Sequence, residues 1–150
     1  MILGNGLIAS AFAMRYHEDP ELIIFARGVS NSRETDPAAF MRERSLLEAC
    51  LDVARGPFVY FSSCAAGDPA QLSASPYLMH KSAMEQLVMS HPQGAVFRLP
   101  QVIGRTGNLS NLANYLYHHI SEGLHFQLWS RAERNLVDVE DVVRIAGTMI

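Results

Sequence analysis

Gly4-Asn5-Gly6-Leu7-Ile8-Ala9 lies between a short apolar stretch and an apolar segment of helical length. It fits the pattern G-x-G-x-x-G/A, which joins a strand to a helix and binds a dinucleotide diphosphate at the helix N-terminus. In this pattern Gly4 allows the tight turn, Gly6 lets the backbone approach the diphosphate, and the small Ala9 lets the helix pack closely on the strand. Glycine turns between strands and helices also occur for packing reasons alone, so both interpretations stay open here.

Downstream of this turn, apolar runs of strand length alternate with longer stretches of helical period, which is typical of βα units on a parallel sheet. The expected strands cover residues 2–3, 22–25, 58–61, 95–99 and 126–129. The expected helices cover residues 7–16, 37–55, 76–91, 111–122 and 139–150. The sequence therefore predicts an α/β domain with a parallel sheet and helices on both faces.

Composition and charge narrow the possible functions. The chain has 150 residues, of which 49% are hydrophobic and 18% charged, as in a soluble globular domain. Its net charge is -3 and its basic residues are scattered, so we expect neither nucleic acid nor an anionic membrane as a partner. No apolar stretch approaches the ~20 residues that span a bilayer. Two cysteines, Cys50 and Cys64, cannot form a disulfide framework, and no histidine has metal-ligand spacing, so we expect a cytoplasmic protein without a metal.

Tyr77 and Lys81 are the strongest candidates for catalytic residues. Four positions make about one helical turn, so the phenol and the ammonium share a helix face. A nearby cation favours the ionised phenol, and Tyr77 could then act as a general acid or base. Such a pair is most often an ordinary surface tyrosine and lysine. However, Lys81 is the only lysine among twelve basic residues, and we interpret its position as functional.

Ser62-Ser63-Cys64 follows the apolar run Phe58-Val59-Tyr60-Phe61. Ligands of open α/β sheets gather where the strands end, so a hydroxyl here could polarise a reacting oxygen beside Tyr77. A polar turn at the end of a strand is an equally good interpretation of these residues alone.

Four segments in order resemble the extended short-chain dehydrogenase/reductases, the NAD-dependent epimerase/dehydratase group that acts on nucleotide sugars. The segments are residues 58–64, residues 75–85 with Tyr77 and Lys81, residues 97–104, and residues 135–143. The resemblance implies a Rossmann-type sheet over residues 1–150, with a minimal substrate-binding segment around residues 101–138 and an incomplete C-terminal end. It also implies NAD or NADP as the cofactor, a nucleotide-sugar-like substrate, a link to surface polysaccharide, and a possible homodimer.

The resemblance also implies a role for individual residues. Tyr77 would be the acid/base, and Lys81 would hold the nicotinamide ribose and lower the pKa of Tyr77. The other residues expected at the cofactor are Gly4, Asn5, Gly6, Leu7, Ile8, Ala26, Arg27, Ser62, Leu99 and Pro100. Gln101, Asn111 and Arg134 would contact the substrate.

Two departures from the family pattern stand out. Cys64 occupies the place of the family's catalytic hydroxyl, so Ser63 would have to substitute or the step would be impaired, because a thiol is a weak donor. The chain also has room for only about two βα units between the glycine turn and Ser62. If residues 23–28 form the second family strand, Arg27 suggests NADP through its 2′-phosphate. If they form a later strand, the adenine-side strands are missing, and we prefer this interpretation.

Two functions follow as hypotheses. The first is an NAD(P)-dependent oxidoreductase, epimerase or dehydratase that acts on a nucleotide sugar through Tyr77 and Lys81. The alternative is a non-catalytic binding or scaffold protein that retains the fold with a degraded cofactor site. The Tyr77 and Lys81 pair favours the enzyme, whereas Cys64 and the shortened adenine side favour the alternative.

Overall fold

The computed structural model describes residues 1–16, 19–105, 109 and 111–150. A four-stranded parallel sheet forms its centre, with strands in the order β1 (Ile2–Leu3), β2 (Ile23–Phe25), β3 (Phe58–Ser63) and β4 (Gly94–Leu99). A small second sheet pairs β5 (Gln101–Ile103) with β6 (Leu136–Asp138), also in parallel. The predicted α/β class with a parallel sheet is confirmed.

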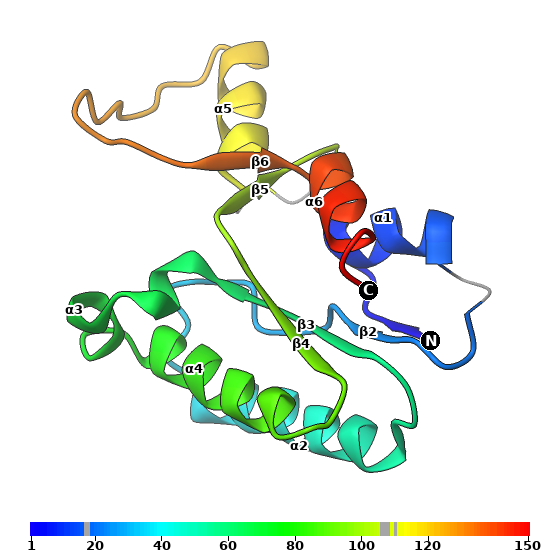
Figure 1. Cartoon of the computed structure of the whole chain (residues 1–150). Coiled ribbons are helices and arrows are strands. Elements are labelled where there is room, and N and C mark those ends of the chain that lie inside the picture. Colours follow the sequence, from blue (N-terminus) through cyan, green and yellow to red (C-terminus); the bar gives the residue numbers. More distant parts are fainter. Residues whose placement is uncertain (17–18, 106–108, 110) are drawn as a thin grey trace.

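Helices cover both faces of the four-stranded sheet (Figure 1). On one face lie α1 (Leu7–Tyr16) and α6 (Val139–Ala146), and on the other lie α2 (Pro37–Val53) and α4 (Pro76–Met89). A 3-10 turn, η1 (Cys64–Gly67), and the short α3 (Pro69–Leu72) lead from β3 to α4, and α5 (Leu112–Ser121) follows β5. None of the helices in the described ranges is long and apolar enough to cross a membrane.

Side chains of the central strands alternate between the two faces, as the geometry of a strand requires. Ile24, Val59 and Phe61 pack against α1 and α6, in a cluster with the fully buried Phe12. Residues on the other face of the same strands, such as Phe25 and Tyr60, pack against α2 and α4. Strands buried on both faces read as continuous apolar runs, which explains why residues 22–25 and 58–61 could be recognised in the sequence.

The strand order decides between the two interpretations of residues 23–28. β2 lies between β1 and β3, and each further strand is added on the same side. In the Rossmann order 3-2-1-4-5-6, the second and third strands lie on the far side of the first strand from the fourth. Here β1 is an edge strand of the sheet formed by the described residues, so β2 takes the place of the family's later strand. The preferred interpretation, with fewer strands on the adenine side, is confirmed.

Two expectations about secondary structure are wrong, and one small sheet was not predicted. Residues 126–129 form no strand, because no other described residues pair with them, and Leu128 and Trp129 are exposed in a loop. The helix expected over 139–150 ends at Ala146, because Gly147 caps it. The small sheet of β5 and β6 was not foreseen, since three-residue strands separated by more than thirty positions have too weak an alternation to be recognised.

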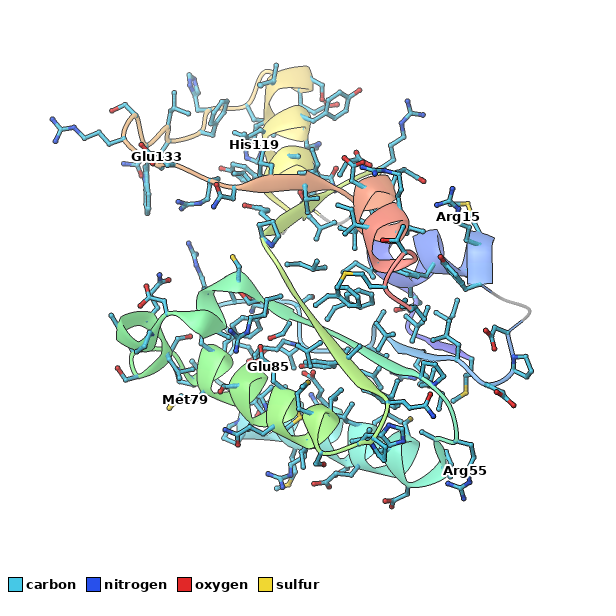
Figure 2. The ribbon with its side chains drawn as sticks, viewed as in Figure 1. Arg15, Arg55, Met79, Glu85, His119 and Glu133 are labelled. Carbon is cyan, nitrogen blue, oxygen red and sulfur yellow. The ribbon has the colours of Figure 1, made fainter. Side chains whose placement is uncertain are left out.

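Two ion pairs attach α4 to the rest of the fold. The carboxylate of the buried Glu85 accepts three hydrogen bonds of 2.6 to 3.2 Å from Arg98 on β4. Figure 2 shows Glu85 on the side of α4 that faces the sheet and Met79 on the opposite side. The second pair joins Lys81 to Glu43 on α2. These contacts fix which face of α4 points toward the sheet.

Candidate functional site

A cleft of about 680 Å³ lies at the carboxyl ends of the strands in the four-stranded sheet. Its walls are the residues that follow β1, β2, β3 and β4, together with one face of α4. Ligands of open α/β sheets bind at this edge. A second hollow, of about 540 Å³, is lined only by residues 129–134 of one loop and gathers no catalytic side chains.

The cleft brings together most of the residues expected at the site from the sequence. They are Asn5, Gly6, Leu7, Ile8, Ala26, Ser62, Ser63, Cys64, Tyr77, Lys81, Leu99, Pro100, Gln101 and Asn111. Three expected residues do not line it. Gly4 lies in the turn beneath the cleft, Arg27 is exposed outside it, and Arg134 lies in the loop of the second hollow and bonds the carbonyl of Glu133.

The loop that follows β2 also lines the cleft, through Gly28, Val29, Ser30, Asn31 and Ser32. From its sequence this segment is recognisable only as a polar loop. Its composition of serine and asparagine directly after a buried strand was the available signal, because polar residues at the end of a parallel strand face the ligand edge.

The two glycines of the turn, Gly4 and Gly6, differ in the space that a side chain would have. Gly4 has a φ of +131°, and a Cβ there would lie 2.5 Å from the carbonyl oxygen of Ala26 and 3.1 Å from the Cβ of Ala9. A Cβ at Gly6 would meet nothing within 4 Å. The fold therefore requires glycine at position 4, whereas the space at Gly6, next to the N-terminus of α1, is open to a ligand such as a diphosphate.

Gly4→Ala should lower the free energy of unfolding by about 2 to 4 kcal/mol, because it combines backbone strain with a backbone clash. Urea unfolding followed by circular dichroism measures the loss. Gly6→Ala is the matched control and should change stability by less than about 1 kcal/mol. Equal losses in the two variants would contradict this account of the turn.

The three residues after Phe61 have different environments. Ser62 is 7% exposed, and its Oγ has no hydrogen-bond partner among the described residues. The Oγ of Ser63 accepts a hydrogen bond from the backbone N–H of Ala65 and so caps the 3-10 turn. Cys64 is exposed. A buried hydroxyl without a partner costs free energy, so Ser62 has the strongest physical reason to meet a ligand in the cleft.

Tyr77 and Lys81 lie on one face of α4, as the spacing predicted, and both line the cleft. The Lys81 Nζ is 5.8 Å from the centroid of the Tyr77 ring. The Tyr77 hydroxyl makes no hydrogen bond to any described residue, so it is available to a ligand. Burial, reinforced by the Glu43 carboxylate, raises the pKa of Tyr77 to about 12. The Lys81 ammonium is paired with the Glu43 carboxylate, and the expected lowering of this pKa by Lys81 stays a prediction.

The partner of Lys81 is Glu43, which the sequence analysis did not single out. The Glu43 Oε1 accepts hydrogen bonds from the Lys81 Nζ at 3.1 Å and from the Tyr60 hydroxyl at 2.7 Å. The Lys81 Nζ also donates to the Tyr60 hydroxyl, at 3.0 Å. Nothing in the sequence marked Glu43 as a buried residue, because its burial depends on how α2 packs on α4.

The second oxygen of Glu43 is also bonded. Its Oε2 accepts a hydrogen bond from the backbone N–H of Val29 at 2.7 Å and lies 3.0 Å from the Nε2 of His80. Burial raises the pKa of Glu43, but His80, Lys81 and the amide of Val29 lower it more, and the resulting pKa is about 2. Glu43 is thus a buried charge with every partner that its two oxygens need.

Stability should fall with acid through Glu43. Its pKa is 4.5 in an unperturbed state and about 2 in the folded chain, so the charged form stabilises the fold above about pH 4.5. That contribution, about 3 kcal/mol, is lost as the pH falls from about 4.5 to 2. Urea unfolding across this range measures it. Glu43→Gln should remove much of the acid dependence, and Glu48→Gln, at an exposed site on the same helix, should retain it. An unchanged acid dependence in Glu43→Gln would refute the assignment.

A protein-family model for the NAD dependent epimerase/dehydratase family matches residues 6–150. The chain belongs to this family. The match includes Gly6 and the whole wall of the cleft downstream of it, so the family resemblance noted for residues 58–64 and 75–85 is confirmed. None of the curated proteins matches the chain.

Among solved structures, the chain is similar to the capsular polysaccharide assembling protein CapF from Staphylococcus aureus. The TM-score is 0.61 at 24% sequence identity, and the match covers 86% of this chain and 37% of that one. At this identity the likeness supports the Rossmann-type fold alone. The family member described here therefore spans little more than a third of the length of this structural relative.

Proposed function

We propose that the protein binds NAD or NADP in this cleft and reduces or isomerises a nucleotide-linked sugar. Tyr77 would be the proton-transferring group. The observation that carries the proposal is the meeting of three features in one cleft: the glycine turn, the unpartnered Oγ of Ser62, and the Tyr77 hydroxyl beside Lys81. Membership of an NAD dependent family supports the same cofactor.

The residues of the cleft fit the diphosphate and the nicotinamide end of a dinucleotide, whereas the adenine side of the fold has fewer strands. The open space at Gly6 and the free N–H groups of the first turn of α1 suit the diphosphate. Lys81 and Ser62 would hold the nicotinamide ribose and amide side, with Leu99 and Pro100 against the ring. When bound, a nicotinamide dinucleotide supplies or accepts a hydride. Arg27 lies outside the cleft, so it gives no support to a preference for the 2′-phosphate of NADP.

Tyr77 can act as the proton donor in a reduction. With a pKa of about 12 the phenol is neutral at pH 7, so it is equipped to donate a proton to a carbonyl oxygen that gains negative charge. The Oγ of Ser62, which has no partner in the described residues, can donate a second hydrogen bond to that oxygen or to the cofactor. Gln101 and Asn111 line the same cleft and would contact the sugar nucleotide, although the Asn111 side chain already bonds Val102 and Ala113.

A specific observation favours the alternative, binding without turnover. The thiol of Cys64, at the end of the strand that leads to the cleft, is a weaker hydrogen-bond donor than a hydroxyl and would assist Tyr77 less. An assay of the purified chain with NADH or NADPH and a panel of nucleotide-linked keto sugars separates the two functions. Loss of reduced nicotinamide absorbance with formation of the hydroxy sugar is the expected result. Cofactor binding without any turnover across the panel would reject the enzymatic function in favour of a non-catalytic binding or scaffold function.

A further inference from the structure

We propose that Glu43 is a positioning residue that holds the Lys81 ammonium, charged and in one orientation, at the wall of the nucleotide cleft. The inference rests on the proposed cofactor site and assigns a role there to a residue on α2 that does not itself line the cleft.

Lys81 is fixed to a degree unusual for a lysine. Its side chain is only 4% exposed, and its Nζ donates to the Glu43 Oε1 and to the Tyr60 hydroxyl. An ammonium has three protons, so these two bonds leave one N–H without a partner among the described residues. Because Lys81 lines the cleft, this remaining proton is the one available to a bound ligand.

Glu43 is held as firmly as the ammonium that it holds. Its two oxygens take four hydrogen bonds or close polar contacts, from Tyr60, Lys81, Val29 and His80. The ring of Phe40, on the same helix as Glu43, stacks on His80 with 4.7 Å between centroids. The carboxylate therefore has no freedom to rotate away from Lys81 without breaking contacts to three other elements.

The backbone at Gly28 lies very close to the ion pair of Lys81 and Glu43. A Cβ at position 28 would be 2.6 Å from the Lys81 Nζ and 2.7 Å from the Glu43 Oε1. The next residue, Val29, donates its N–H to Glu43. The loop after β2 thus approaches the ion pair closely because position 28 has no side chain, and Glu43 ties that wall of the cleft to the lysine.

The proposed role of Glu43 depends on the negative charge of its carboxylate, which keeps Lys81 protonated. Burial disfavours the ammonium form of Lys81, and the Glu43 carboxylate is the main group that offsets this, with a smaller contribution from Glu85. The other groups around the pair are Tyr60, Tyr77 and His80, and Glu85 is itself neutralised by Arg98. Without the carboxylate at position 43, Lys81 should lose its proton at lower pH and with it the charged donor that faces the cleft.

The test uses the fact that Lys81 is the only lysine in the chain. Growth with labelled lysine gives one side-chain NMR signal, whose pH titration reports the ionisation of this ammonium without any cofactor. In Glu43→Gln the titration should move to lower pH than in the natural protein, while Glu48→Gln on the exposed side of α2 should leave it unchanged. Identical titrations in the natural protein and Glu43→Gln would overturn the proposal.

NADH affinity measured across the same pH range links the titration to the cleft. In Glu43→Gln the dissociation constant should rise about tenfold for each pH unit above the midpoint of Lys81, and the rise should begin at lower pH than in the natural protein. Failure of the natural protein to bind NADH would refute the cofactor site, but the NMR titration would still test Glu43. If Glu43→Gln does not fold, hydrogen exchange at the Lys81 Nζ in the natural protein tests the proposal instead. Slow exchange of these protons would support an ammonium held in one orientation, and fast exchange would reject it.

Discussion

Tyr77→Phe should reduce turnover of a nucleotide-linked keto sugar by about 10² to 10⁴-fold, which is the range for loss of a general acid. The substitution removes only the hydroxyl, and that hydroxyl bonds no described residue, so the fold should keep its stability within about 1 kcal/mol. The steady-state rate, measured through the absorbance of NADH, gives the effect. Cofactor affinity should change little, because the phenyl ring remains in the cleft.

Tyr117→Phe is the matched control, since Tyr117 is 76% exposed on α5 and is not among the residues that line the cleft. Its turnover should equal that of the natural protein. Full activity of Tyr77→Phe would remove the phenol from the mechanism, and a parallel loss of NADH binding would instead make Tyr77 a cofactor-binding residue.

Lys81→Met should lower the free energy of unfolding by about 3 to 5 kcal/mol at neutral pH, because it leaves Glu43 as a buried carboxylate without its cation. Methionine has nearly the volume of the lysine stem, so the loss reports charge rather than a cavity. Urea unfolding at pH 7 measures it. The variant should also lose affinity for NADH, since the donor that faces the cleft is gone.

The double variant Lys81→Met with Glu43→Leu separates charge from packing. Removing both charges should recover part of the lost stability, because no unpaired charge stays buried, while the Val29 N–H and the Tyr60 hydroxyl lose their acceptor. NADH affinity should stay low in the double variant. Additive losses of stability would contradict the ion-pair account and indicate that each side chain acts through packing alone.

Much of the fold could be predicted because its signals are local. The turn at Gly4 and Gly6 marks the boundary between β1 and α1, and the apolar run at 58–61 marks a strand buried on both faces. The four-residue spacing of Tyr77 and Lys81 correctly placed both on one face of α4. The preference for missing adenine-side strands came from the segment Ala26-Arg27-Gly28-Val29 and the long helix after it, which lead directly into the strand that ends in Ser62-Ser63, and the strand order agrees with it.

The rest depended on contacts between distant segments. The sequence places Lys81 beside Tyr77, but only the packing of α2 against α4 brings Glu43 to the ammonium, where its carboxylate helps to raise the pKa of Tyr77. Similarly, the apolar residues at 126–129 suggested a strand, but a strand needs a partner, and the described chain supplies none beside them. The partner of β5 is β6, more than thirty residues away.

Titration of the purified chain with NADH, and separately with NADPH, tests most directly whether this cleft is a nucleotide site. The fluorescence of the reduced nicotinamide should change saturably with one nucleotide per chain, and Gly6→Val, which fills the open space at the first turn of α1, should weaken the binding while the fold persists. No binding of either nucleotide at millimolar concentration would contradict the account.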